Sequence, residues 1–238
     1  KNVNFSYIPK TNLIQNLNLS VKQGQKIAFV GPTGCGKSTI INLLMRFYDV
    51  DSGEILINGR NVKSIDAKEL KDMFGIAFQN DTIFSDTIKE NIVFGRNISD
   101  EDLQKAIKVS QAHDFIYNQK EGLETILTPK GTNISGGQKQ RLYIARALAN
   151  NPEILILDDS SSALDYKTDS LLRQEIQKNY NTTTIIIAQR ISSIKHSDFI
   201  LVLDEGKTVG YGTHEQLMET SSIYNEIYQS QMGGGINE

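Results

Sequence analysis

The stretch Gly31-Pro-Thr-Gly-Cys-Gly-Lys-Ser-Thr39 matches the pattern G-x-x-x-x-G-K-[ST] at every fixed position. The apolar run Lys26–Val30 before it is typical of a strand buried on both faces of a parallel sheet. After the loop, residues 39–47 carry apolar side chains at helical spacing. A strand, a glycine-rich loop and a helix in this order predict a loop that binds phosphate groups. The alternative, a chance glycine-rich turn, leaves the two flanking elements unexplained.

The residue types of this loop suit a polyphosphate. Glycines let the backbone curl around phosphates and aim its N–H groups at them, and the helix start adds the positive end of its dipole. Lys37 can bridge the β- and γ-phosphates, and the Ser38 hydroxyl can ligate Mg²⁺. We interpret Cys35 as a small filler residue rather than a nucleophile. The predicted phosphate-binding residues are Gly31, Pro32, Thr33, Gly34, Cys35, Gly36, Lys37, Ser38 and Thr39.

A second element should supply a carboxylate for the metal. Residues 154–157 read Ile-Leu-Ile-Leu, a buried strand, and Asp158 and Asp159 follow directly. Ligands of parallel sheets bind at the carboxyl ends of the strands, where this strand delivers its acidic side chains. We therefore predict Asp158 as the Mg²⁺ residue, acting mostly through coordinated water. The alternative is that Asp158 only caps the next turn.

The remaining sequence alternates strand and helix patterns, which predicts an α/β fold with a mostly parallel sheet. Alternating apolar residues near the N-terminus and the Asn58-Gly59 turn predict an additional antiparallel β subdomain. Strands are expected at 3–7, 13–21, 26–30, 53–57, 154–157, 183–188, 199–203 and 207–212. Helices are expected at 39–47, at 165–179, in two short stretches near the C-terminus and, with short breaks, over 66–118. We expect one domain over 1–232 with a helical subdomain inserted at about 80–150, and a flexible tail at 233–238.

Composition and charge argue against several classes of protein. The 25 Lys and Arg against 28 Asp and Glu give a net charge of −3, so a dedicated nucleic-acid surface is not expected. A single cysteine excludes an internal disulfide framework and a cysteine-rich zinc site. No apolar run approaches the roughly 20 residues that cross a bilayer, and no signal segment opens the chain. Because the sequence begins directly with a strand pattern, we expect it to be part of a longer polypeptide.

The run Asn133-Ile-Ser-Gly-Gly-Gln138 adds a more specific motif. Ser135 and Gln138 form a capping-box pattern, which predicts a helix from this point to about Ala149. The two glycines at the helix start would leave N–H groups facing outward, which is an arrangement suited to an anion. The alternative is an ordinary helix cap followed by a Gly-Gly turn.

With this motif beside the phosphate loop and the carboxylate strand, the chain resembles the nucleotide-binding domain of ATP-binding cassette (ABC) transporters over essentially its whole length. It looks most like exporters whose transmembrane domain precedes this domain in the same polypeptide. The resemblance implies a P-loop NTPase core with an α-helical signature subdomain, and an ATPase that uses ATP and Mg²⁺ for transport. It also implies a second ABC nucleotide-binding domain as partner, and a place at the cytoplasmic face of the cell membrane.

The resemblance further implies roles for residues outside the phosphate loop. Tyr7 matches the aromatic that stacks on adenine, although an aromatic in a strand is usually part of the core. Gln79 matches the glutamine that reaches the metal and the attacking water, and Asp165 matches an aspartate that communicates across the dimer. The signature residues that would close over ATP held by the opposing domain are Ser135, Gly136, Gly137 and Gln138.

Three positions depart from the family pattern. Asp159 stands where the catalytic glutamate is usual, and a carboxylate shorter by one methylene falls back from the water by about 1 Å, which can lower the rate on the order of a hundredfold. Gln189 stands where the switch histidine is usual and cannot become cationic. Thr128-Pro-Lys-Gly131 lacks the usual acidic residue before the signature. The two catalytic departures predict a hydrolysis-impaired site, as in the degenerate half of a heterodimeric exporter with a non-identical partner chain.

Other classes of ATPase are alternatives to an exporter. A soluble ABC-type ATPase acting as a regulatory or translation-associated switch is the alternative hypothesis. A chromosome-associated ATPase would need a long coiled coil between the two nucleotide motifs, and that segment shows no sustained heptads. We interpret the arginines of the signature helix, Arg141 and Arg146, as solvated or structural. The three histidines, His113, His196 and His214, are interpreted as surface or packing residues.

Overall fold

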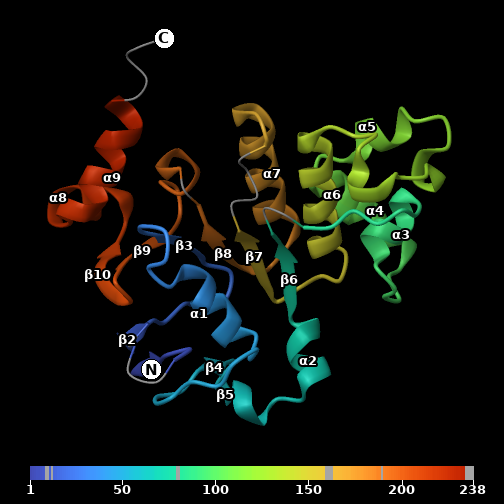
Figure 1. Ribbon diagram of the computed structural model, residues 1–238. Helices are drawn as coiled ribbons and strands as arrows, with labels where there is room; N and C mark the ends of the chain where they lie inside the picture. Colours follow the sequence, from blue (N-terminus) through green and yellow to red (C-terminus); the bar gives the residue numbers. More distant parts are fainter. Residues whose placement is uncertain (9–10, 12, 79–80, 159–162, 189, 234–238) are drawn as a thin grey trace. The chain divides into compact units, whose positions relative to one another are not determined.

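The computed structural model describes residues 1–8, 11, 13–78, 81–158, 163–188 and 190–233 (Figure 1). The chain divides into two compact units, the first made of residues 1–71 and 185–238 and the second of residues 72–184. Each unit has a hydrophobic core of its own. None of the helices within the described ranges is both long and apolar enough to span a bilayer.

Short antiparallel strands lie at the start of the first unit. Strand β1 (Val3–Phe5) pairs with β2 (Ile14–Leu17), and β4 (Leu56–Ile57) pairs with β5 (Arg60–Asn61). The turn between β4 and β5 has positive φ at both central residues, 51° at Asn58 and 79° at Gly59, as a type I′ hairpin requires. The predicted antiparallel β subdomain is confirmed, with strands shorter than the sequence pattern suggested.

The larger sheet of the first unit has the strand order β10-β9-β3-β8. Strand β3 (Lys26–Val30) is parallel to β9 (Phe199–Asp204), which pairs with the antiparallel edge strand β10 (Lys207–Gly212). Strand β8 (Thr183–Ile187) crosses the boundary between the units, and its residues 185–187 belong to the first. The last four residues of β3 are at most 2% exposed, as a strand buried on both faces should be.

The helices of the first unit follow the phosphate loop or lie near the C-terminus. Helix α1 (Lys37–Leu44) begins directly after the glycine loop. The last two helices of the described residues are α8 (His214–Thr220) and α9 (Ser222–Gly233), which match the two short helices predicted there. Two 3₁₀ helices, η1 (Val62–Ser64) and η4 (Ile191–Ser193), and the first turns of α2 (Ala67–Asp72) complete this unit.

The second unit combines a pair of parallel strands with a group of helices. Strand β6 (Phe74–Ala77) is parallel to β7 (Ile154–Asp158), with Phe74 opposite Ile154. In Figure 1 the helices α3 to α6 form one group. The helices of this unit are α3 (Ile88–Val93), α4 (Asp100–Val109), α5 (His113–Tyr117), η2 (Gly122–Glu124), η3 (Pro129–Gly131), α6 (Gly136–Leu148) and α7 (Tyr166–Asn179).

Strand β6 contradicts the helical pattern expected over 66–118. Its four residues form too short an apolar run to be distinguished from a buried helix by periodicity, and Gly75 weakens the strand pattern further. The structure explains this glycine, because a Cβ at position 75 would lie 2.1 Å from the carbonyl oxygen of Ala147 on α6. Close packing of α6 on β6 therefore selects glycine against strand propensity.

Candidate functional site

The phosphate loop has the backbone geometry that its glycines predict. Gly31 has a φ of 151°, and a Cβ there would lie 2.0 Å from the carbonyl oxygen of Leu203 on β9. Gly36 has a φ of 110° and precedes the first residue of α1, and its Cβ would lie 2.6 Å from the Ile14 side chain. Both positions require glycine, since a side chain would clash and the backbone is in a region that L-residues rarely adopt. The loop is thus held tightly at its two ends.

Lys37 lies at the first position of α1 and folds back across the loop. Its ammonium group donates hydrogen bonds to the carbonyl oxygens of Gly31 at 2.7 Å and Pro32 at 2.9 Å. The Cys35 thiol sulfur lies 3.5 Å away, and this side chain is buried, as expected for a filler residue. The positive charge is therefore fixed over the loop, where a phosphate oxygen would be a stronger acceptor than a neutral carbonyl.

The start of α1 offers the donors that a polyphosphate with Mg²⁺ needs. The N–H groups in the first turn of an α-helix have no partner within the helix, and here they belong to Lys37, Ser38 and Thr39. Thr39 is buried and Ser38 is exposed, so the hydroxyl predicted as a metal ligand is accessible. Residues 32–34 of the loop are exposed as well. A polyphosphate fits these N–H donors, and the accessible Ser38 hydroxyl fits a cation bound to it.

Tyr7 lies beyond the end of β1 rather than inside a strand, which corrects the predicted strand 3–7. The strand ends at Phe5, and Tyr7 is 45% exposed. An exposed ring fits a base-stacking role better than the alternative of a core aromatic. Its hydroxyl accepts a hydrogen bond of 3.2 Å from the side-chain amide of Asn42 on α1. No sequence pattern indicated this contact, since the two residues are 35 positions apart.

Asp158 is the last residue of β7 in the second unit. Its neighbours Leu155, Ile156 and Leu157 are buried, whereas Asp158 itself is half-buried. A buried strand therefore delivers this carboxylate to its carboxyl end, as the sequence predicts.

The signature motif forms the cap that the sequence predicts. Ser135 is the N-cap of α6, and its hydroxyl oxygen accepts from the backbone N–H of Gln138 at 3.3 Å. In return the Gln138 side-chain oxygen accepts from the backbone N–H of Ser135 at 2.8 Å. Ser135 and Gly136 are exposed. The structure thus confirms the capping box and leaves the exposed helix start available to an anion.

The signature lies beside the segment that leads to α7. A Cβ on Gly137 would lie 3.2 Å from the carbonyl oxygen of Ala163, so these backbones approach closely. Two residues later Asp165 forms the N-cap of α7 and accepts from the backbone N–H of Thr168 at 2.9 Å and from its hydroxyl at 2.7 Å. These hydrogen bonds, led by the Thr168 hydroxyl, lower the pKa of Asp165 below its usual value. Asp165 therefore has a structural role as a cap besides the predicted one.

Three predicted catalytic residues, Gln79, Asp159 and Gln189, lie outside the described residues. Their roles stay predictions. The same holds for most of the tail expected at 233–238, of which the structure describes only the last residue of α9.

Arg146 on α6, which the sequence predicts to be solvated or structural, is a buried cation. Its guanidinium donates to the carbonyl oxygens of Asn91 at 2.7 Å and Thr82 at 3.0 Å, and pairs with Asp81 at 3.3 Å. Burial, partly offset by Asp81, lowers the pKa of Arg146 below its usual value. Tyr143 on the same helix donates its hydroxyl to the carbonyl oxygen of Asp81. The interpretation of Arg146 as structural is confirmed. Its contacts, with that of Tyr143, anchor to α6 the segment from Asp81 to Asn91.

Replacing Arg146 with methionine should lower the free energy of unfolding by about 3 kcal/mol, because removing one partner of a buried ion pair leaves the other groups without a donor. This value lies at the low end of the range for breaking a buried ion pair, because Asp81 is partly exposed. Guanidinium unfolding followed by circular dichroism measures the change. The matched control is Arg60→Met, since the Arg60–Glu69 pair is exposed and should contribute at most about 1 kcal/mol. Equal losses in both variants would contradict the anchoring role.

Arg141 and His214 also have packing roles. Arg141 donates to the carbonyl oxygen of Gln111 at 2.9 Å and lies over the Phe115 ring. His214 shares a hydrogen bond of 2.8 Å with the buried hydroxyl of Tyr224, and His113 lies at the surface beside Asp114. These observations agree with the interpretation of these residues as structural or superficial.

Parallel strands, a glycine loop that leads into a helix, and a carboxylate at the end of a buried strand define a nucleotide-binding domain of the phosphate-loop class. A family profile described as "ABC transporter" matches residues 14–162. The chain belongs to the ABC transporter family. The resemblance seen in the sequence is confirmed.

The relatives include two proteins of Staphylococcus aureus whose names describe them as multidrug export ATP-binding/permease proteins. One, from strain bovine RF122 / ET3-1, is 44% identical over 232 residues, which are 96% of this chain and 40% of the relative. The other, from strain NCTC 8325 / PS 47, is 45% identical over 221 residues, or 92% of this chain and 38% of the relative. The chain thus spans about two fifths of the length of these relatives.

Among solved structures, a bacterial Atm1-family ABC exporter with ATP bound matches with a TM-score of 0.90 and 39% identity, over 97% of this chain and 41% of that one. These relatives support the exporter prediction. They give no support to the alternative of a regulatory or translation-associated switch.

Proposed function

We propose that this chain binds Mg-ATP at its glycine loop and couples ATP binding and hydrolysis to export through a transmembrane domain in the same polypeptide. The observation that carries the proposal is the Lys37 ammonium, which the carbonyls of Gly31 and Pro32 hold over the loop at the start of α1. A cation fixed beside free helix N–H groups is an arrangement that favours phosphate. The domain would act at the cytoplasmic face of the cell membrane, and no nucleic acid takes part.

Several side chains would each bind a different part of the nucleotide or its metal ion. Lys37 would contact the β- and γ-phosphates, and the exposed Tyr7 ring would stack on adenine. Ser38 and Asp158 would hold Mg²⁺, with Gln79 as a further oxygen donor. When bound, the metal neutralises charge on the phosphates and so favours phosphoryl transfer to water.

The partner in this proposal is a second, non-identical ABC nucleotide-binding domain. Asp159 and Gln189 would make hydrolysis slow at the site that this chain's loop forms. The exposed start of α6, from Ser135 to Gln138, would complete the partner's site instead, and Asp165 would communicate between the two. ATP that bridges two domains favours the closed dimer, because the bound nucleotide contacts both domains only in that state.

The metal part of the proposal predicts a specific change in Asp158→Asn. The wild-type chain should bind ATP more tightly with Mg²⁺ than with EDTA. In the variant, this ratio of affinities should be about tenfold smaller, which corresponds to roughly 1.4 kcal/mol. The reason is that an uncharged amide attracts a divalent cation and its water less strongly than a carboxylate. Equilibrium titration with fluorescent ATP, with and without EDTA, measures both values.

The matched control for this titration is Asp100→Asn, since Asp100 is exposed in the first turn of α4. Retention of the full Mg²⁺ effect in Asp158→Asn would remove Asp158 from the metal site. A wild-type chain that takes up no ATP at millimolar concentration would overturn the proposed function itself.

A further inference from the structure

A hydrogen bond joins the exposed aromatic Tyr7 to the helix that follows the phosphate loop. The side-chain amide of Asn42 donates to the Tyr7 hydroxyl at 3.2 Å. Asn42 is half-buried on α1, five positions after Lys37. At 1.5 Å per residue, this places it roughly 7.5 Å along the helix from the lysine. The contact therefore sets the position of the ring relative to the phosphate loop.

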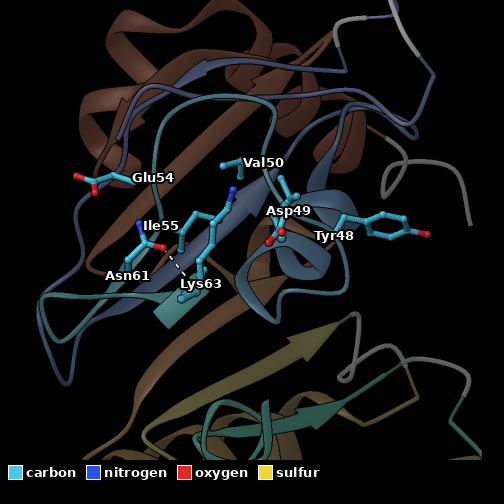
Figure 2. A pocket seen from close by; sticks show the side chains of 9 residues that line it. Tyr48, Asp49, Val50, Glu54, Ile55, Asn61 and Lys63 are labelled. Carbon is cyan, nitrogen blue, oxygen red and sulfur yellow. Dashed lines mark hydrogen bonds between the residues drawn. The ribbon is translucent and has the colours of Figure 1, made fainter. Parts of the chain in front are cut away.

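Two other rings hold Tyr7 on its sides. Phe5 and Tyr48 each approach it nearly perpendicularly, both with ring centroids 4.9 Å away. Tyr48 also borders a small crevice lined by Val50, Ile55 and Lys63, among others, but Figure 2 shows its ring pointing away from the other labelled side chains. Edge-to-face pairs of this kind stabilise a fixed orientation. Tyr7 nevertheless stays 45% exposed, so part of its surface is open to a ligand.

We propose that Asn42 is a positioning residue for the nucleobase. It holds the Tyr7 ring at a fixed distance from Lys37 and the loop, so that base stacking and phosphate binding occur without moving either group. The proposal rests on the proposed function, since it assigns the base of the same nucleotide to Tyr7. Pre-organisation of this kind raises affinity because less freedom is lost on binding.

The test compares ATP with tripolyphosphate, which lacks the base and the ribose. The variants are Asn42→Leu, Tyr7→Phe and the double change, each titrated with fluorescent ATP and competed with tripolyphosphate. Each single variant should weaken ATP binding about two- to tenfold, as expected for one lost hydrogen bond, with tripolyphosphate binding unchanged. The double variant should be no weaker than either single one, because both changes remove the same contact.

A conservative variant and a matched control complete the design. Asn42→Asp should keep the wild-type ratio of the two affinities, because the Tyr7 hydroxyl can donate to a carboxylate and the added charge affects both ligands. Asn225→Leu removes a comparable amide hydrogen bond on α9 and should leave both affinities unchanged.

Three outcomes would overturn the inference while leaving the proposed function intact. They are an unchanged ATP affinity in Asn42→Leu, an equal loss for both ligands, which indicates a purely structural role, and equal wild-type affinities for the two ligands. If the wild-type chain binds neither ligand, the proposed function fails as well.

Discussion

Replacing Lys37 with alanine should weaken ATP binding roughly 10- to 150-fold, since a hydrogen bond to a charged group contributes about 1.5–3 kcal/mol. The effect is large because the ammonium is already held in place by the loop carbonyls, so little freedom is lost when a phosphate replaces them. Titration with fluorescent ATP in the presence of Mg²⁺ measures the loss.

Two further variants show whether the charge causes the effect. Lys37→Met keeps most of the aliphatic stem and should lose as much affinity as the alanine variant. Lys22→Ala removes an exposed lysine of the same unit and should leave binding unchanged. Thermal unfolding shows whether the loop variants still fold. A Lys37→Met chain that is folded and binds ATP normally would contradict the assignment of the phosphate site.

Changing both Asp159 to glutamate and Gln189 to histidine should raise ATP turnover on the order of a hundredfold. Glutamate is one methylene longer, and a shift of about 1 Å in a catalytic group can change the rate on the order of a hundredfold. Histidine adds a side chain that becomes cationic near neutral pH and can offset developing charge on the phosphoryl group. Each single change should give a smaller increase.

Turnover is best measured over a series of concentrations of this chain, since two copies supply both halves of a composite site. The matched control carries Asp100→Glu and Gln119→His at two exposed positions and should turn ATP over like the wild type. A wild-type chain whose turnover already equals that of the double variant would refute the hydrolysis-impaired site and, with it, the need for a non-identical partner.

Sequence patterns predicted those parts of the fold that depend on interactions between neighbouring residues. The bounds of β3 were predicted correctly, because its continuous apolar run has a strong turn signal on its C-terminal side. The cap at Ser135 and the turn at Asn58 were predicted because side-chain chemistry and positive φ are properties of a few neighbouring residues. The helix expected at 39–47 is observed as α1, from Lys37 to Leu44, so its existence was predicted correctly but both of its ends were placed two to three residues too late.

Contacts between distant segments could not be predicted in this way. Strand β6 depends on the approach of α6 to Gly75, and the burial of Arg146 depends on acceptors at Thr82 and Asn91. The hydrogen bond from Asn42 to Tyr7 is of the same kind. Such contacts form only when the chain is folded, so the spacing of residues in the sequence does not predict them.

The close approach of Gly31 to Leu203 also limits how this protein can evolve. Any substitution at position 31 would introduce a Cβ only 2.0 Å from a main-chain oxygen, and that oxygen cannot swing aside as a flexible side chain could. Homologous chains can therefore carry another residue at this position only if the β9 backbone also shifts. Invariance of this residue would thus reflect steric exclusion by a neighbouring strand as much as selection for nucleotide affinity.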